Sequence, residues 1–578
     1  MTDPVRIANC SGFFGDRLSA AWEMVEGGPI DVLTGDWLAE LTMLILSRTR
    51  AKRPGGGFAS TFVTQIEQVM GTCLDRGIKV VSNAGGLDPA GCADAVHEVA
   101  DRLGLSPTIA DVDGDDLMPR LAELAAAGAL GPFDDGTGTE LGDVDRMLTA
   151  NAYLGGWGIV EALHRGADIV ITGRVTDAAV VCGPAAWHHG WARDDWDALA
   201  GAVVAGHVIE CSGQATGGNY SFFTEVPGMD RIGFPWADVA SDGSCVIGKH
   251  DGTGGQVSIG TITSQLLYEI GGPRYLGPDV TSRFDTIELT EVAPDRVRIS
   301  GVRGEPPPST LKVATNELGG YRNSIAVALT GLDIEAKAEV VAAAFWRACP
   351  YAPSDFAAVD TRLIRTDHAD PTSNEAATAQ LRITVKDPDE RKVGRAFSNA
   401  FIETALASIP GLYGLGGGPS AATPYGVYRP AAVPADLVPA YVHVAGETVQ
   451  VSSVAPETAH PPADRADRTA DRASAGTPDL APTGATERRP LGSVVGTRSG
   501  DKGGNANLGV FARTPAGYEW LASFLTIERV RELLPETADL AIDRHELANL
   551  SALNFVIYGL LQEGVAASTR IDAQAKSL

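Results

Sequence analysis

Residues 78–104, IKVVSNAGGLDPAGCADAVHEVADRLG, place an apolar run, a glycine-containing tip and a helix-like segment in direct succession. Ala, Val and Leu recur at helical spacing in the last of these parts. The same succession recurs after the apolar runs VRIAN (5–9), IDVLTG (30–35) and ADIVITG (167–173). Strands that alternate with helices of this length favour a parallel sheet with helices on both faces. We therefore expect an α/β domain with glycine-rich strand-end loops over residues 1–250.

The pattern of the sequence no longer alternates between strands and helices in this way after residue 250. Residues 285–304 have the pattern of a hairpin and residues 334–349 that of an amphipathic helix, so we expect a mixed α+β region over 251–450, packed on the first domain. Residues 451–490 contain no Ile, Phe, Trp, Tyr or Met, and such a segment buries too little apolar surface to fold. The sequence thus predicts a disordered linker there and a small α+β domain over 491–578.

Charge and cysteine content narrow the classes of partner. Lys and Arg number 46 against 73 Asp and Glu, a net charge of −27, which repels nucleic acid and anionic membrane surfaces. The same charge repels small anionic metabolites, so a site for a small anionic substrate must be locally basic. Seven scattered cysteines do not indicate a disulfide framework, and we see no signal peptide or membrane-length apolar run. We expect a cytoplasmic protein, assembled as a homo-oligomer.

Three strand-end residues are the candidate catalytic groups. Ligands of an open parallel sheet bind outside the carboxyl ends of its strands, where Asp36, Arg174 and Asp177 follow apolar runs. Arg174 is suited to anchor an anionic group, and either aspartate to move a proton if burial raises its pKa. The alternative is that the two aspartates cap the following helices or form structural salt bridges.

The same strand ends supply glycine and polar residues suited to substrate binding. Backbone amides of glycine loops and a nearby arginine hold carboxylates or phosphates well. The residues predicted on this ground are Gly12, Gly15, Asp16, Arg17, Asn83, Gly85, Gly86 and Thr176.

A second glycine-rich block, residues 210–220, combines small residues with hydrogen-bonding side chains. Such a block suits a pocket wall that approaches a polar ligand, although a set of tight turns explains it equally well. Its predicted substrate-binding residues are Gln214, Thr216, Gly217, Gly218 and Asn219.

The densest polar signal is GTRSGDKGGNANLG, residues 496–509. Its spacing does not match a P-loop, but its two cations on a flexible backbone indicate an anion site. A glycine-rich hairpin with solvated charges is the alternative. The residues predicted to bind substrate here are Arg498, Ser499, Asp501, Lys502, Asn505 and Asn507.

No cofactor fingerprint is recognisable. The dinucleotide pattern GxGxxG is absent from the first strand end, and neither a GxSxG elbow nor an HExxH motif occurs. The ten histidines are scattered, which argues against a structural zinc site, and we assign no metal ligands. Carboxylates at the strand ends leave a divalent ion open. The cofactor, if any, stays unknown.

Several motifs together resemble one known family. SGFFGDR, SNAGG, ITGRVTDAA, ECSGQATGGN and above all GTRSGDKGGNANLGV are similar to segments of the acyclic terpene utilisation family. The resemblance implies a large N-terminal domain followed by a small ferredoxin-like domain. It also implies a place in the catabolism of geranyl- and related branched acyl-CoA compounds, but it carries over no catalytic residues.

These inferences lead to two hypotheses about function. The first is a catabolic enzyme that acts on a branched or terpenoid carboxylate or acyl-CoA by acid–base chemistry of the lyase or hydratase type. The alternative is a non-catalytic accessory or assembly subunit of an acyl-CoA carboxylase or related complex. A phosphate-ester hydrolase is a third reading, which would require a metal.

Overall fold

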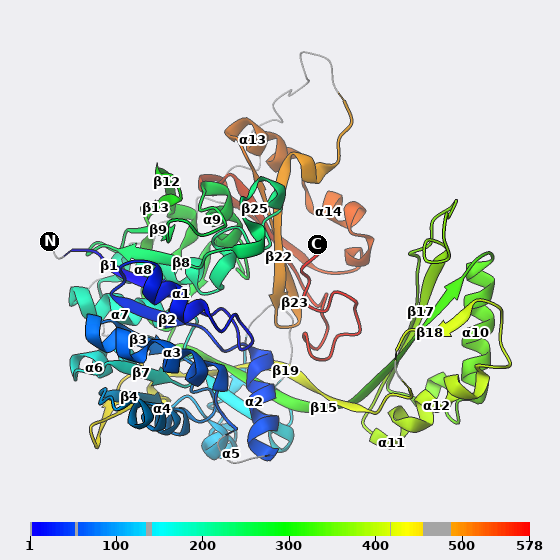
Figure 1. The fold of residues 1–578 in the computed structure, drawn as a ribbon, viewed down its shortest axis with the longest axis horizontal. Helices are drawn as coiled ribbons and strands as arrows, with labels where there is room; N and C mark the ends of the chain where they lie inside the picture. Colours follow the sequence, from blue (N-terminus) through cyan, green and yellow to red (C-terminus); the bar gives the residue numbers. More distant parts are fainter. Residues whose placement is uncertain (1–2, 53–55, 134–140, 417, 455–486) are drawn as a thin grey trace. The chain divides into compact units, whose positions relative to one another are not determined.

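The structure is a computed structural model that describes residues 3–52, 56–133, 141–416, 418–454 and 487–578 (Figure 1). Of the linker expected at 451–490, residues 455–486 therefore lie outside the described residues.

The chain divides into two compact units. The first comprises residues 1–316, 428–565 and 574–578, and the second comprises 317–427 and 566–573. Strand β15 (Thr310–Thr330) and strand β19 (Thr423–Pro434) each begin in one unit and end in the other. None of the helices in the part of the chain that the structure describes combines the length and apolarity that a membrane crossing demands.

The first unit is built on an eleven-stranded mixed sheet, in the order β12-β13-β9-β8-β1-β2-β3-β7-β4-β20-β21. Its five central strands are parallel: β1 (Val5–Asn9), β2 (Val32–Gly35), β3 (Lys79–Ser82), β7 (Ile169–Thr172) and β4 (Ile109–Asp113). The flanking strands are antiparallel: β8 (Pro235–Val239), β9 (Cys245–Lys249), β13 (Arg296–Ser300), β12 (Glu288–Ala293), β20 (Ala440–Val444) and β21 (Glu447–Val451).

The prediction of a parallel sheet is therefore correct only for its centre. Residues 235–249, whose two strands are joined by a tight turn, add an antiparallel hairpin at one side, because a short connection reverses the chain. Residues 288–300 and 440–451, most of which were expected in an α+β region that packs on the first domain and completes it, extend the same sheet at its two edges. Patterns in the sequence identify strands but not their neighbours, so this edge pairing was missed.

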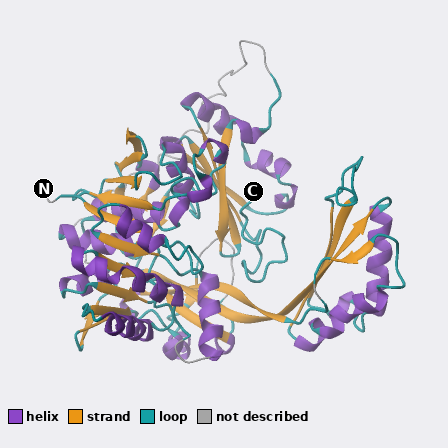
Figure 2. Ribbon diagram, viewed as in Figure 1, coloured by secondary structure: helices purple, strands orange, loops and turns teal. Residues whose placement is uncertain are grey.

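Side chains of the central strands alternate between two apolar clusters. Val5, Ile7 and Val81 enter the cluster that contains α6 (Trp157–His164), α7 (Ala179–His189) and α8 (Trp196–Ile209). Ala8 and Val80 enter the cluster with α1 (Ala20–Gly27), α3 (Ser60–Arg76) and α4 (Pro89–Leu103). Successive strand residues point to opposite sides of a sheet, so the helices of the two clusters pack against opposite faces (Figure 2).

The first unit has further helices and strands outside this sheet. They are α2 (Glu40–Lys52), α5 (Leu121–Ala126), β5 (Gly131–Pro132), β6 (Met147–Ala152), α9 (Ile259–Leu266), β10 (Arg274–Leu276), β11 (Thr281–Arg283) and β14 (Arg303–Glu305).

Residues 487–578, here called the C-terminal module, form a four-stranded antiparallel sheet in the order β22-β23-β25-β24. Its elements are β22 (Val495–Lys502), β23 (Asn505–Ala512), α13 (Pro515–Phe524), α14 (Ile527–Leu533), β24 (Ile542–Leu547) and β25 (Ala552–Ile557). Leu508, Leu521 and Phe555 form its core. Gly509 lies against Leu267, where a Cβ would clash, so β23 approaches the end of α9 closely.

The second unit is an antiparallel sheet with its own helices. The continuation of β15 pairs with β17 (Thr378–Asp387), which pairs with β16 (Ala358–Ile364), and β18 (Leu412–Gly414) also pairs with β15. Its helices are α10 (Ile334–Ala348), α11 (Glu390–Val393) and α12 (Arg395–Thr404). Phe345 and Phe397 join the helices to the strand residue Val385 in one apolar cluster.

Candidate active site

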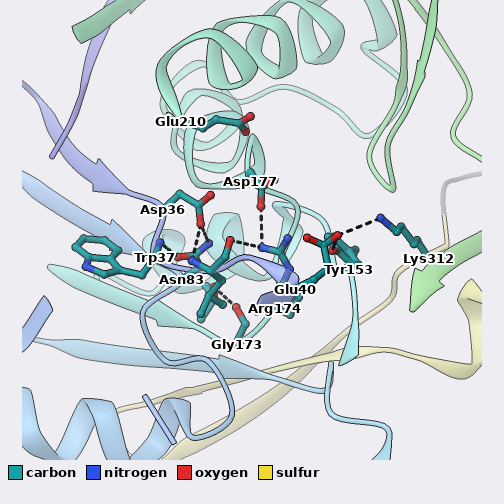
Figure 3. Close-up of polar contacts among 12 residues, drawn as sticks. Asp36, Trp37, Glu40, Asn83, Tyr153, Gly173, Arg174, Asp177, Glu210 and Lys312 are labelled. Carbon is teal, nitrogen blue, oxygen red and sulfur yellow. Dashed lines mark hydrogen bonds and ion pairs between the residues drawn. The ribbon is translucent and has the colours of Figure 1, made fainter. Parts of the chain in front are cut away.

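A large open cleft of about 2940 Å³ lies in the first unit. Its lining includes the loops after β2 and β7, the segment from residue 268 to 278, residues 310–312 of β15, and residues of the C-terminal module. The predicted catalytic residues Asp36, Arg174 and Asp177 all line this one cleft (Figure 3). Ligand pockets are typically about 300–1,000 Å³, so this cleft has room for a large ligand.

Arg174 occupies the centre of the polar cluster at the strand ends. It follows β7, and only 2% of the residue is exposed. Its Nη1 donates to Asp177 Oδ1 at 2.7 Å and to the Leu38 carbonyl at 3.3 Å. Its guanidinium also stacks over the Tyr153 ring at 4.2 Å. The buried cation is thus fixed by three contacts and balances the charge of Asp177.

Asp177 does not cap the following helix. Helix α7 starts at Ala179, and Ala178 before it occupies the N-cap position without a side-chain capping bond. Asp177 instead pairs with Arg174. Asp36 in turn accepts the Leu38 N–H at 3.0 Å, ahead of the start of α2 at Glu40. Both aspartates therefore form their bonds within the polar cluster and do not cap a helix.

Asp36 is a buried carboxyl group. Its Oδ1 accepts a bond from Asn83 Nδ2 at 2.5 Å, and Asn83 is itself oriented by the Trp37 N–H at 2.8 Å. Burial raises the pKa of Asp36 to about 8, the charge of Asp177 adds to this, and Arg174 opposes it. Asp36 is therefore largely protonated at neutral pH.

Glu210 is a second buried acid, which the sequence did not single out as a site residue. It follows α8, lines the cleft, and its Oε2 has no hydrogen-bond partner. Burial and the charges of Asp177 and Asp36 hold its pKa well above the usual range. The signal was present in the sequence: a glutamate at the end of the apolar run ALAGAVVAGHVIE has no solvated face to occupy.

His207 lies one helical turn before Glu210. Its Nδ1 is 3.6 Å from Glu210 Oε1, too far for a hydrogen bond. Tyr275 and Phe284 pack around its ring, and burial lowers its pKa to about 4. His207 is therefore neutral at neutral pH.

Glu40 behaves in the opposite way, although it is close in sequence to Asp36. It accepts a bond from the Tyr153 hydroxyl at 2.9 Å, and Lys312 Nζ lies 3.5 Å from its Oε1. Burial alone would raise the pKa of Glu40, but Lys312 and Arg174 outweigh it and lower the pKa to about 2. The ammonium of Lys312 lies over the Tyr153 ring at 4.8 Å and the Tyr428 ring at 5.6 Å. This side of the cleft is therefore ionised.

Comparison with known proteins identifies the family. Residues 5–444 match the family model described as acyclic terpene utilisation family protein AtuA. The chain belongs to the acyclic terpene utilisation family. Residues 489–578 match the model of the AtuA ferredoxin-like domain, which coincides with the C-terminal module. No curated protein and no solved structure matches the chain.

Of the predicted substrate-binding residues at the strand ends, Gly12 and Thr176 line the cleft of this family member. Asp16 instead accepts the N–H groups of Gly12 and Arg17, at 2.9 and 2.8 Å, and thereby fixes its own loop. The side chain of Arg17 pairs with Glu23 at 2.7 Å. Asn83 orients Asp36, as described above.

The predicted glycines at the strand ends have packing roles. A Cβ at Gly85 would strike the Thr172 carbonyl, and Gly86 has a φ of +54° and lies against Leu46. Gly15 lies against the ring of Phe13.

In the second glycine block, Gln214 alone of the five predicted residues lines the cleft. The Thr216 hydroxyl donates to the Gly233 carbonyl at 2.6 Å inside the protein. Gly217 and Asn219 have φ values of +108° and +58°, and Gly218 packs on the Gly213 backbone. For these four residues the structure shows turns.

The family motif at residues 496–509 is divided between two roles. Asp501, Lys502 and Asn505 line the cleft. Arg498, Ser499 and Asn507 are buried, and the Arg498 guanidinium stacks over Tyr268 at 4.0 Å and bonds Gln214. Within the described parts of the chain, no group of three or more His, Cys, Asp or Glu residues is arranged to hold a metal ion.

Proposed function

We propose that this member of the acyclic terpene utilisation family is an enzyme that acts on a branched or terpenoid acyl-CoA or carboxylate by acid–base chemistry of the lyase or hydratase type. One observation carries the proposal: the protonated acids Asp36 and Glu210 share a cleft with the ionised Glu40. Carboxyl groups whose environments drive their pKa values apart are the usual mark of paired acid and base roles.

The chemistry requires one group to give a proton and another to take one. In water addition to a conjugated thioester, a carboxylate takes a proton from water as the oxygen bonds the β-carbon. The electron pair of the double bond moves to the thioester oxygen, and a protonated acid then supplies the proton that the α-carbon gains. In retro-aldol cleavage a carboxylate takes the hydroxyl proton, the Cα–Cβ bond breaks, and the acid protonates the α-carbon. Asp36 and Glu210 are the candidate donors.

The cleft also offers an anchor for the polar end of such a substrate. Lys312 is held by the Tyr153 and Tyr428 rings, and about a third of its side chain is exposed (31%). An ammonium in this position suits a carboxylate or a thioester oxygen. Arg174, balanced by Asp177, is more buried and holds the adjoining wall. Phe13, Leu38 and Leu311 give the cleft apolar surface for a branched hydrocarbon chain.

The test uses geranyl-CoA and its β-hydroxy adduct as probes in D₂O with the full chain. Mass spectrometry follows water addition, water loss, and release of acetyl-CoA that carries a carbon-bound deuterium. We expect turnover of one probe by the wild type, with loss of about 10²–10⁴-fold in Asp36→Asn and Glu210→Gln. Glu288→Gln, an exposed position on β12, is the matched control. Absence of turnover and of binding for both probes would contradict the proposal.

A further inference from the structure

Glu269 is a carboxyl group on the cleft wall that the reaction outlined above leaves without a role. It follows α9 and has a φ of +59°, in the left-handed region that residues with a side chain seldom adopt. Two glycines, Gly271 and Gly272, come shortly after it. A glutamate is thus held in this conformation close to residues that would adopt it freely, and the surrounding contacts must impose it.

Two buried amides of the C-terminal module impose this conformation. Asn507 Oδ1 accepts the Glu269 N–H at 2.8 Å, and Asn507 Nδ2 donates to the Leu267 carbonyl at 2.9 Å. Asn554 Nδ2 donates to the Ile270 carbonyl at 3.3 Å, and the two amides bond each other at 2.5 Å. Both side chains are fully buried. Three of these bonds fix the backbone on both sides of Glu269, and the fourth joins the two amides to each other.

The same module supplies charges around the Glu269 side chain. Lys502 Nζ donates to the Glu269 carbonyl at 3.0 Å. Lys576 bonds the Tyr268 hydroxyl and lies 3.9 Å from Asp501. Asp501, Lys502 and Lys576 all line the cleft. The module therefore forms a wall of the cleft and is more than an appended domain.

We propose that Glu269 is the proton-accepting residue of this cleft, and that the C-terminal module acts as its positioning element through Asn507 and Asn554. The inference rests on the proposed acid–base function. Asp36 and Glu210 are the candidate donors, and Glu40 is a weak base because Lys312 and Arg174 lower its pKa to about 2. The reaction therefore also needs a stronger base that accepts a proton from water or from a hydroxyl. Glu269 takes that proton as a carboxylate. After the products leave, Glu269 releases the proton to solvent and the acid that donated a proton takes one back, so the site returns to its starting state.

The electrostatics of Glu269 fit this role. Burial and the charge of Asp501 raise its pKa to about 7, Lys576 opposes them, and Glu40 adds to the rise. The charge of Glu269 in turn contributes to the raised pKa values of Glu210 and Cys211. A general base works best when its pKa is close to the working pH, because both protonation states are then populated.

The first experiment is the D₂O turnover assay with Glu269→Gln in the full chain. We expect a loss of about 10²–10⁴-fold together with the disappearance of the rise in rate near pH 7. Glu269→Asp should recover part of the rate, since it retains the carboxylate. Asn507→Leu should move the midpoint of the pH profile. A purely structural loss would lower the rate at every pH and leave the midpoint unchanged. Glu532→Gln, an exposed residue of α14, should match the wild type.

A direct titration keeps the inference falsifiable if a variant folds poorly. Carbon-13 NMR of protein labelled at the glutamate carboxyls should show one group titrating near pH 7 that Glu269→Gln removes. If Glu269→Gln keeps the wild-type rate and pH profile while Asp36→Asn abolishes turnover, the inference is overturned and the proposed function stands. If the titration lacks that group, the inference also fails. No turnover by the wild type, with the group present, overturns the proposed function instead.

Discussion

Two corners of one cleft hold carboxyl groups in opposite states. At the end of β2, Asp36 is enclosed by Asn83 and backbone, and its pKa rises to about 8. Four residues later, Glu40 meets Lys312 and the Tyr153 hydroxyl, and its pKa falls to about 2. Asp36 is 5% exposed and the Glu40 side chain 31%, yet partial burial would still raise the pKa of Glu40, so the cation beside Glu40 is the deciding difference. The difference teaches that a nearby accessible cation decides which carboxyl is ionised.

Arg174 connects the two corners, so its loss should have the largest effect. Arg174→Met removes a buried cation and leaves Asp177 unpaired, a change that typically costs about 3–5 kcal/mol in free energy of unfolding. Chemical denaturation measures this loss. Arg165→Met removes a salt bridge at the surface and serves as the control. It should cost less than about 1 kcal/mol in free energy of unfolding. Equal losses in the two variants would contradict the central position given to Arg174.

The acid corner should make the folded state less stable at high pH. The pKa of Asp36 is raised from 3.8 to about 8, so the folded state binds this proton more tightly than the unfolded state. The stabilisation is complete below the unfolded pKa and is lost as pH rises through about 8. Asp36→Asn should therefore flatten the decline in melting temperature between about pH 5 and pH 9. Asp251→Asn, at an exposed position, should leave the decline unchanged.

The ionised corner should respond to removal of its cation. Lys312→Met takes away the charge that lowers the pKa of Glu40, so this pKa should rise, as carboxyl carbon-13 NMR would show. Binding of geranyl-CoA, measured by calorimetry, should weaken roughly tenfold, or about 1.4 kcal/mol. Lys52→Met at the end of α2 is the matched control. An unchanged Glu40 titration would break the comparison between the corners.

The sequence predicted the part of the site that parallel strands bring together. Asp36, Arg174 and Asp177 meet because β2 and β7 are parallel neighbours of β3, so that their carboxyl ends share one edge. Each of these residues follows closely after an apolar run, so its place at a strand end could be predicted from the sequence. The ionisation states could not be predicted, because they depend on partners from distant segments.

The site residues that the sequence did not predict lie outside the alternating parallel strands and helices. Lys312 lies on β15, Glu210 follows a helix, and Glu269 depends on Asn507 and Asn554 from the C-terminal module. Their positions result from tertiary packing between segments hundreds of residues apart. Conversely, Arg498 has the pattern of an anion ligand, but on β22 it is buried against Tyr268 and Gln214.

The central claim is that this cleft holds a carboxyl group protonated at neutral pH beside an ionised one. Carbon-13 NMR of protein labelled at the aspartate carboxyls, with Asp36 assigned by its disappearance in Asp36→Asn, tests the protonated partner most directly. The predicted result is a titration midpoint near pH 8 for Asp36. A midpoint close to the ordinary value of 3.8 would contradict the account, because Asp36 would then have no proton to donate.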